Sequence, residues 1–222
     1  MKVIITGATG MVGKGVLLEC LADDSVEKAL VINRRSVGLE HDKFQEVLVK
    51  DFFDLTEIEN KLIGYDACFF CLGVSSAGMA EAAYHRVTHD LTLHFAHKLL
   101  EHNPRMVFCY VSGAGTDSSE KGRIMWARVK GKTENALLEL PFKDAYMFRP
   151  GYIQPLKGTR STVRSYQFIY TIFKPIYPLL ALFPSAFTDT VKIGKAMLNA
   201  ARNGCSKKRL SNADIDSLSK NL

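Results

Sequence analysis

Residues 3–13, VIITGATGMVG, place three chain signals next to one another near the start of the sequence. The run VII is β-branched and typical of a buried parallel strand, and the TG after it indicates a turn. From Met11 onward, apolar residues recur at helical spacing. We therefore expect the first strand of the fold, a glycine turn and a helix, in that order.

Three glycines of this stretch, Gly7, Gly10 and Gly13, recur at a spacing of three. A turn of this kind directs unpaired backbone N–H groups and the positive end of the helix dipole to one point, where a diphosphate can bind. Glycine is needed because a Cβ would block the turn or the ligand. A tight turn whose glycines serve only packing is the alternative, but its position directly after the first strand favours dinucleotide binding.

The composition indicates a globular chain. With 222 residues, 47% of them hydrophobic, it can bury a sizeable core, and we expect residues 1–222 to form a single domain. The sequence enters a strand directly after Met1, so we predict no signal peptide. Five cysteines without an export signal indicate reduced thiols and a cytoplasmic location.

The net charge of +6 comes from the C-terminal third, because residues 151–222 hold 11 Lys/Arg against 3 Asp. An acidic substrate, an anionic membrane surface or nucleic acid could each use this excess, and a solvated lysine-rich face is the simpler explanation. The sequence shows no recognition helix and no aromatic-basic strand motif, so we predict no nucleic-acid partner.

A second apolar strand, Lys28–Asn33, runs into Asn33-Arg34-Arg35. In a dinucleotide-binding fold this point meets the adenosine ribose, where an acidic residue binds the 2′-hydroxyl of NAD. Here two guanidinium groups stand in place of the acid, and they can pair with a 2′-phosphate. NADP is therefore predicted, with NAD less favoured; two surface arginines after a strand are the alternative.

Further strands are expected at Phe44–Val49, Ala67–Leu72 and Arg105–Val111, alternating with helical patterns. Parallel neighbours need crossovers, so this alternation predicts an α/β fold with a doubly wound parallel sheet, the Rossmann fold. Asp51-Phe52 should lie beside an adenine ring. The loop Ser112–Gly115 follows the fifth strand, at the carboxyl edge of the sheet where sites of such folds form.

Two other motifs are interpreted as structural. Residues three apart on an extended strand point to opposite faces, so Cys68 and Cys71 are expected to be buried thiols and not a redox pair. On the helical stretch that follows, Glu81, His85 and His89 recur every four residues and could form a metal-binding face. Because no further ligand with suitable spacing is evident, we favour a solvated helix surface and predict no metal.

The motifs together resemble a known superfamily. TGATGMVG, the Leu72-Gly73 loop, the serine that ends the fifth strand and the helix with Lys130 look like the short-chain dehydrogenases/reductases. Phe148–Gly151 resembles the segment of extended, epimerase-like and atypical members that passes over the nicotinamide. VKGKTENALL (129–138) followed by MFRPG (147–151) is most similar to small atypical members related to the HIV Tat-interacting protein. The resemblance covers residues 1–155 strongly.

This resemblance implies that Ser112 hydrogen-bonds a substrate carbonyl and that Lys130 holds the nicotinamide ribose. The family's catalytic tyrosine lies four residues before the lysine, where this chain has Trp126. An indole N–H donates a hydrogen bond but cannot exchange the proton that accompanies hydride transfer. Three outcomes stay open: another proton source, such as Tyr84, Tyr152 or a water held by Ser112; a different chemistry; or cofactor binding without turnover.

Trp126 is expected either as an aromatic residue at the edge of the core or as a wall of the substrate pocket. The candidate catalytic residues are Ser112 and Lys130. The candidate cofactor-binding residues are Gly7, Thr9, Gly10, Met11, Val12, Gly13, Asn33, Arg34, Arg35, Asp51, Phe52, Cys71, Leu72, Gly73, Lys130, Pro150, Gly151, Tyr152 and Ile153.

The chain changes character at residues 156–187, which are first basic and then rich in aromatic and aliphatic residues. We expect a small C-terminal helical cap with apolar walls for a substrate. Three prolines and Lys174 argue against a transmembrane helix, and contact with a membrane surface is a lesser alternative. A helix over Thr188–Arg202, a short strand over Lys207–Leu210 and a helix over Asn212–Leu218 should complete the chain.

Two functions are consistent with these features. The first is an NADP-dependent oxidoreductase of atypical mechanism that acts on a small carbonyl, alcohol or sugar-nucleotide-like substrate. The second is a non-catalytic NADP-binding regulator or redox sensor that binds a protein partner. Trp126 favours the second function, whereas Ser112 and Lys130 favour the first.

Overall fold

The computed structural model describes residues 1–159 and 186–220. Seven strands within these ranges form one sheet, in the order β3-β2-β1-β4-β5-β6-β9, and every neighbouring pair is parallel. The chain runs outward from β1 to β3 and then returns to β4 on the other side of β1, which confirms the doubly wound α/β fold. The strands are β1 (Lys2–Thr6), β2 (Lys28–Asn33), β3 (Phe44–Leu48), β4 (Ala67–Phe70), β5 (Val107–Val111), β6 (Asp144–Phe148) and β9 (Arg209–Leu210).

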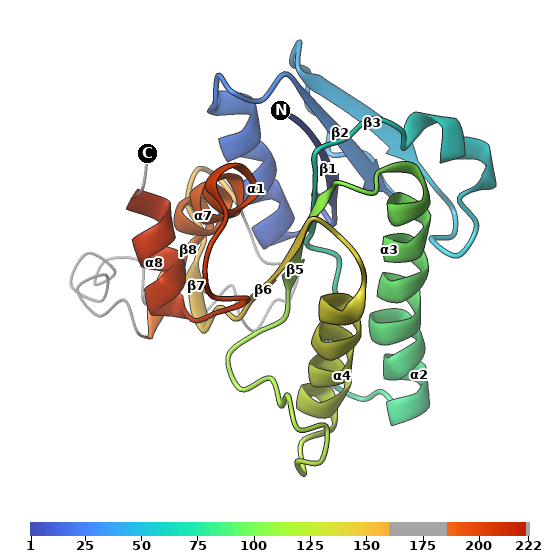
Figure 1. Cartoon of the computed structure of the whole chain (residues 1–222), viewed down its shortest axis with the longest axis vertical. Coiled ribbons are helices and arrows are strands. Elements are labelled where there is room, and N and C mark those ends of the chain that lie inside the picture. Colours follow the sequence, from blue (N-terminus) through green and yellow to red (C-terminus); the bar gives the residue numbers. More distant parts are fainter. Residues whose placement is uncertain (160–185, 221–222) are drawn as a thin grey trace.

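Helices cover both faces of the sheet. Figure 1 shows α1, α7 and α8 on one side, and α2, α3 and α4 on the other. A 3-10 turn, η1, follows β3, and a π-helical turn, η2, joins α2 to α3. The bounds are α1 (Met11–Ala22), η1 (Thr56–Lys61), α2 (Glu81–His85), η2 (Arg86–Asp90), α3 (Leu91–His102), α4 (Met125–Glu139), α7 (Thr190–Asn203) and α8 (Asn212–Lys220).

The core consists of two apolar layers, one on each face of the sheet. Val3 and Ile5 of β1 pack toward α1 and α7, whereas Ile4 packs toward η1 and α3. Successive residues of a strand point to opposite faces, so a strand covered on both sides must be apolar at every position. This explains why the first strand reads as an uninterrupted β-branched run.

Helices α1 and α7 cross closely because glycine lies at the contact on each of them. A Cβ on Gly15 would lie 2.5 Å from the Cβ of Thr190, and one on Gly194 would lie 2.6 Å from the Cγ of Glu19. The hydroxyl of Thr190 also accepts a hydrogen bond of 3.1 Å from the backbone N–H of Leu156. The end of the first described range is thereby fastened to the start of α7.

A second, two-stranded parallel sheet, β7 (Tyr152–Gln154) with β8 (Phe187–Asp189), was not predicted from the sequence. The helix expected from Thr188 instead begins at Thr190, because Thr188 belongs to β8 and Asp189 caps the helix by accepting from the backbone N–H of Lys192.

Several other predicted bounds were wrong by one to two residues. The strands expected at Phe44–Val49, Ala67–Leu72, Arg105–Val111 and Lys207–Leu210 are each shorter, and the last helix continues to Lys220. The prediction of a cap over residues 156–187 falls mostly outside the described residues. Among the described residues, no helix is long and apolar enough to cross a bilayer.

Candidate functional site

The glycine turn has the geometry that the sequence predicts. Gly7 adopts a φ of +71°, and a Cβ there would lie 2.7 Å from the backbone carbonyl carbon of Cys71. A Cβ on Gly13 would lie 2.3 Å from the carbonyl oxygen of Gly7. Both positions therefore require glycine. The turn closes with a 2.9 Å hydrogen bond from Gly10 N–H to the Gly7 carbonyl oxygen.

Helix α1 begins directly after this turn, at Met11, with Gly10 in an extended conformation as its N-cap. Within residues 1–159 and 186–220 no side chain caps this helix, so its first N–H groups are left for a ligand. Thr9 is exposed at the turn, and Met11 and Val12 are half-buried. This end of the helix is suited to bind a phosphate group.

Asn33, at the end of β2, lies against the turn. Its side-chain oxygen accepts a 3.2 Å hydrogen bond from Ala8 N–H, whereas its buried Nδ2 has no hydrogen-bond partner among the described residues. A buried amide without a partner costs free energy, so an acceptor atom of a ligand fits this position. Arg34 and Arg35 follow and are exposed. The residues at this strand end therefore fit a nucleotide cofactor.

A pocket of about 170 Å³ lies at the carboxyl ends of β2, β3 and β4. It brings together five residues predicted to bind the cofactor, namely Arg34, Asp51, Phe52, Leu72 and Gly73. Its other lining residues, which sequence reasoning missed, are Lys50, Phe53, Val74, Val87 and Leu91. The first three are neighbours of predicted residues, but Val87 and Leu91 come from η2 and α3, and no motif marks them.

Ser112 and Lys130 meet through the backbone. The Lys130 ammonium donates a 2.5 Å hydrogen bond to the carbonyl oxygen of Ser112. Burial lowers the pKa of Lys130 to about 8, and the nearby Glu134 carboxylate opposes this shift. The Ser112 hydroxyl is buried and donates a 2.5 Å hydrogen bond to Glu134 Oε1. Its action on a substrate stays a prediction.

Trp126 lies one helical turn before Lys130 on α4, and its indole covers the loop after β5. A Cβ on Gly115 would lie 3.6 Å from the Cη2 atom of this ring. The indole is half-buried, so it lies at the edge of the core and against the loop that holds Ser112.

A buried ion pair beside Ser112 was missed by sequence reasoning. Glu134 has no exposed surface and binds Arg149 with two nitrogens, Nε at 3.0 Å and Nη2 at 2.5 Å. The second nitrogen also donates to Ser118. The pair ties α4 to the end of β6. The only sequence features that could have indicated this ion pair were the arginine within MFRPG and the carboxylate four residues after Lys130.

The segment after β6 lies beside the loop after β5. Ala114 N–H donates to the Pro150 carbonyl oxygen at 2.8 Å, and Gly151 N–H donates to Asn212 Oδ1 at 2.9 Å. Tyr152 and Ile153 continue into β7 and are half-buried. The structure thus brings predicted residues 150–153 next to the loop that contains Ser112.

The two tyrosines considered as proton sources both form hydrogen bonds within the protein. Tyr84 is buried, and burial raises the pKa of its phenol, partly offset by a hydrogen bond with Thr88. Tyr152 donates its hydroxyl hydrogen to Gln154 Oε1 at 2.9 Å. A proton-transfer role for either residue stays a prediction.

The cysteines of the C-x-x-C pattern are free thiols. Burial raises the pKa of Cys71 to about 12 and that of Cys68 well above its usual value. Neither sulfur is a reactive thiolate at neutral pH, which agrees with a structural role. The structure does not bring Glu81 together with His85 and His89, since the Glu81 carboxylate pairs with Arg128 at 2.7 Å.

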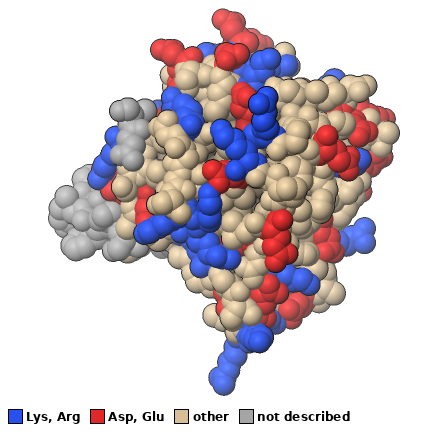
Figure 2. All heavy atoms as spheres, viewed as in Figure 1, with Lys and Arg blue, Asp and Glu red and all other residues tan. Residues whose placement is uncertain are grey.

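The basic residues of the described C-terminal range are mostly paired with carboxylates. Lys192 and Lys220 contact Asp216, Lys207 contacts Asp214, and Lys208 contacts Asp144. Figure 2 shows acidic atoms beside basic ones over much of one face. The charge excess of this region is therefore largely neutralised locally.

Comparison with known proteins identifies the family. The chain is 32% identical to the rat protein HTATIP2 over 154 residues, 68% of this chain and 62% of that protein, so the match spans less than two thirds of the rat protein. It is 31% identical to the mitochondrial protein FMP52 of Eremothecium gossypii over 164 residues, 73% of this chain and 69% of that protein. This chain is an atypical short-chain dehydrogenase/reductase.

Solved structures agree on the fold of this short-chain dehydrogenase/reductase. The Bordetella bronchiseptica enzyme WbmF, in complex with NAD+, superposes with a TM-score of 0.67 at 15% identity, over 97% of this chain and 76% of that one. A short-chain dehydrogenase/reductase from Saccharomyces cerevisiae gives 0.68 at 13% identity, over 98% and 97%. No family model matches the sequence.

Proposed function

We propose that this protein binds NADP(H) at the glycine turn and uses it as an oxidoreductase on a small substrate. The observation that carries the proposal is the pocket that joins Arg34, Asp51, Phe52, Leu72 and Gly73. These residues come from three strand ends; Arg34, Asp51 and Phe52 were expected near the adenosine, and Leu72 and Gly73 were expected to bind the cofactor. A largely apolar pocket of this size suits a flat aromatic base.

The preference for NADP over NAD rests on Arg34 and Arg35. Both guanidinium groups are exposed directly after Asn33, whose buried Nδ2 lacks an acceptor among the described residues. A 2′-phosphate can pair with a guanidinium through two charge-assisted hydrogen bonds, whereas a 2′-hydroxyl gains little from it. NADPH, when bound, would supply the hydride.

In this proposal Lys130 and Trp126 prepare the reacting end of the cofactor. Lys130 is held at the Ser112 carbonyl oxygen, and its remaining N–H groups would donate to the ribose beside the nicotinamide when the cofactor is bound. Trp126, packed over Gly115, forms a wall of the substrate pocket. The loop after β5 therefore fixes both residues.

Binding of four nucleotides to the tag-free protein tests the proposal. Calorimetry and thermal-shift titrations with NADP+, NADPH, NAD+ and NADH should show NADP(H) binding at least about 10-fold more tightly, which corresponds to about 1.4 kcal/mol. Equal or tighter binding of NAD(H) would overturn the cofactor assignment. Loss of the reduced cofactor's absorbance with a panel of aldehydes, ketones and sugar nucleotides then tests the oxidoreductase activity.

A second candidate is a non-catalytic NADP-binding regulator that binds a protein partner. It is favoured by Trp126, which cannot exchange a proton, and by the Ser112 hydroxyl, which faces Glu134 inside the protein. Tight NADP(H) binding without oxidation across the whole panel would favour this candidate over the enzyme.

We further propose a cytoplasmic location, because all five cysteines are free thiols. The name of the fungal relative FMP52 places that protein in mitochondria. Fractionation of the source cells distinguishes the two compartments.

A further inference from the structure

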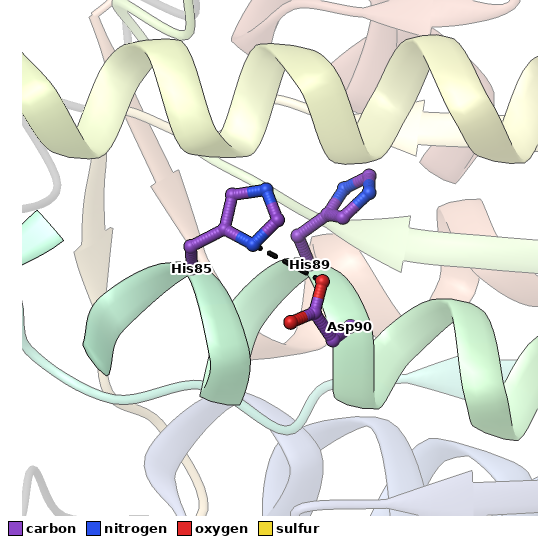
Figure 3. Close-up of side chains that lie close together, drawn as sticks. All are labelled: His85, His89 and Asp90. Atoms are coloured by element: carbon purple, nitrogen blue, oxygen red, sulfur yellow. Dashed lines mark ion pairs between the residues drawn. The ribbon is translucent and has the colours of Figure 1, made fainter. Parts of the chain in front are cut away.

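Two histidines and an aspartate come together where α2 passes into α3. One ring nitrogen from each of His85 and His89 and one carboxylate oxygen of Asp90 lie within 4.8 Å of one another. Figure 3 shows the three side chains on one stretch of helix, with His85 directed to Asp90. The Nδ1 of His85 is 3.1 Å from Oδ1 of Asp90, and the two imidazole centroids are 4.6 Å apart.

The π-helical turn η2 explains this grouping. In an α-helix, residues five apart are separated by about 140° around the axis, so positions 85 and 90 would diverge. A π-helical turn hydrogen-bonds residue i to residue i+5, and here Leu91 N–H donates to the Arg86 carbonyl oxygen. The wider turn brings position 90 under position 85. The i, i+4 spacing in the sequence therefore identified the two histidines as candidate ligands. It gave Glu81 as the third candidate ligand, whereas the structure brings Asp90 to the histidines.

The chemistry of the cluster suits a metal ion. His89 Nδ1 is buried and has no hydrogen-bond partner among the described residues. This imidazole nitrogen is therefore left unused by the described residues, as a position for a further ligand requires. Two ligand atoms that bind zinc at a tetrahedral angle are about 3.4 Å apart, close to the His85–Asp90 separation.

Charged residues on other elements also act on His89. Burial is the main cause that lowers the pKa of His89; His85 and Lys132 of α4 lower it further, and the carboxylates of Asp90 and Glu120 oppose this shift. Glu120 belongs to the loop before α4 and has a φ of +62°. Asp90, Glu120 and Lys132 are therefore charged groups that act on His89.

We propose that His85, His89 and Asp90 bind one divalent metal ion of the zinc class, with water completing the coordination. Imidazole together with carboxylate is a ligand set that zinc, cobalt and nickel accept. The site is separate from the nucleotide pocket, because the residues of this segment that line the pocket are Val87 and Leu91. The inference therefore does not depend on the proposed function.

A second cluster with similar residues serves as a control. Glu59, Glu101 and His102 also offer three ligand atoms within the same distance. However, the Lys98 ammonium lies 3.5 Å from Glu59 and 2.9 Å from Glu101, so a cation already neutralises both carboxylates. We expect no metal there.

The test is a titration of metal-stripped, tag-free protein with Co²⁺ and Zn²⁺. Calorimetry should show one ion per chain, and bound Co²⁺ should give visible absorption bands that Zn²⁺ displaces. His85→Ala and His89→Ala should each weaken binding at least about 10-fold, the loss of one ligand's contribution. His102→Ala should leave the affinity unchanged.

Circular dichroism and urea unfolding show whether each variant is folded. If His89→Ala does not fold, the test uses His85→Ala. The imidazole of His85 is partly exposed, so its removal should disturb the packing less. Wild-type protein without a cobalt spectrum, or a doubly substituted H85A/H89A protein with unchanged affinity, would overturn the proposal. An effect of pH on the His85–Asp90 pair without any metal binding would also overturn it, since the cluster would then bind only protons.

Discussion

The Lys130 ammonium reaches the backbone carbonyl oxygen of Ser112, not the serine hydroxyl. The hydroxyl is directed to Glu134, so the two residues of the family pattern are linked through the main chain. Substitution of the Ser112 side chain should therefore leave the lysine amine in place. The position of the amine depends instead on the loop after β5 and on helix α4.

The pH dependence of cofactor binding should report on Lys130. Burial lowers the pKa of this amine to about 8. If the ammonium form holds the cofactor ribose, the affinity for NADP(H) is complete below pH 8 and falls as the pH rises through that value. Calorimetric titrations on both sides of pH 8 measure this. Lys130→Arg should bind with little change over the same range, whereas a wild-type affinity that stays constant would contradict the assignment.

Arg34 and Arg35 should control the choice of cofactor. Replacement of either by alanine removes a charge-assisted contact to the 2′-phosphate, which contributes about 1.5–3 kcal/mol, or about 10-fold or more in affinity. The affinity for NAD(H) should not change, because NAD lacks this phosphate. Dissociation constants of the single variants for both cofactors provide the check. A parallel loss for NADP(H) and NAD(H) would count against a 2′-phosphate contact.

Trp126→Tyr should introduce the missing proton donor. The phenol would stand one helical turn before Lys130, a neighbouring cation that lowers a tyrosine pKa. We expect the rate of carbonyl reduction to rise by a factor of about 100, within the range for a general acid, while NADP(H) affinity is maintained. Trp126→Phe is the control for the change in ring size. If the Tyr and Phe variants show equal turnover, another group supplies the proton.

Gly13→Ala should prevent formation of the nucleotide site. The added methyl group would lie 2.3 Å from the Gly7 carbonyl oxygen, a distance that forces α1 away from the turn. We expect a loss of about 3 kcal/mol in the free energy of unfolding and no measurable NADP(H) binding. For stability alone, Gly73→Ala is the matched control, because its added Cβ would meet no described atom within 4 Å outside its chain neighbours; since Gly73 lines the nucleotide pocket, only the unfolding of this variant is compared. Urea unfolding of both variants gives the comparison.

The Glu134–Arg149 pair should be important for stability. Glu134→Gln would leave the Arg149 guanidinium without its carboxylate in a buried setting, at a cost of about 3 kcal/mol. Glu81→Gln removes a similar contact to Arg128 where the carboxylate is half exposed, and should cost less than about 1 kcal/mol. Thermal and urea unfolding measure both. Equal losses would show that burial does not determine the strength of the pair.

The glycine turn and the strand ends around it could be predicted because their signals are local. Gly7 and Gly13 are required by backbone geometry within a single turn, and Arg34 follows a strand that the pattern identifies directly. A parallel sheet then places these strand ends at one edge, so the pocket follows from the topology.

The remaining part depends on contacts between distant segments. Whether the Ser112 hydroxyl faces the solvent or Glu134 is set by the packing of α4 against β5, which no local pattern encodes. The pairing of Tyr152 with Phe187 in β7 and β8 joins residues far apart in the chain. Asp90 was missed because a π-helical turn departs from the helical spacing assumed for the sequence.

The hydroxyl of Thr190 joins the end of the first described range, residues 156–159, to the start of α7. It accepts from Leu156 N–H at 3.1 Å and lies 3.5 Å from the hydroxyl of Thr159, while α7, which it begins, is packed on α1. The placement of residues 156–159 therefore depends on the same pair of helices that supports the glycine turn, so a substitution at the contact between α1 and α7 should be felt at both places.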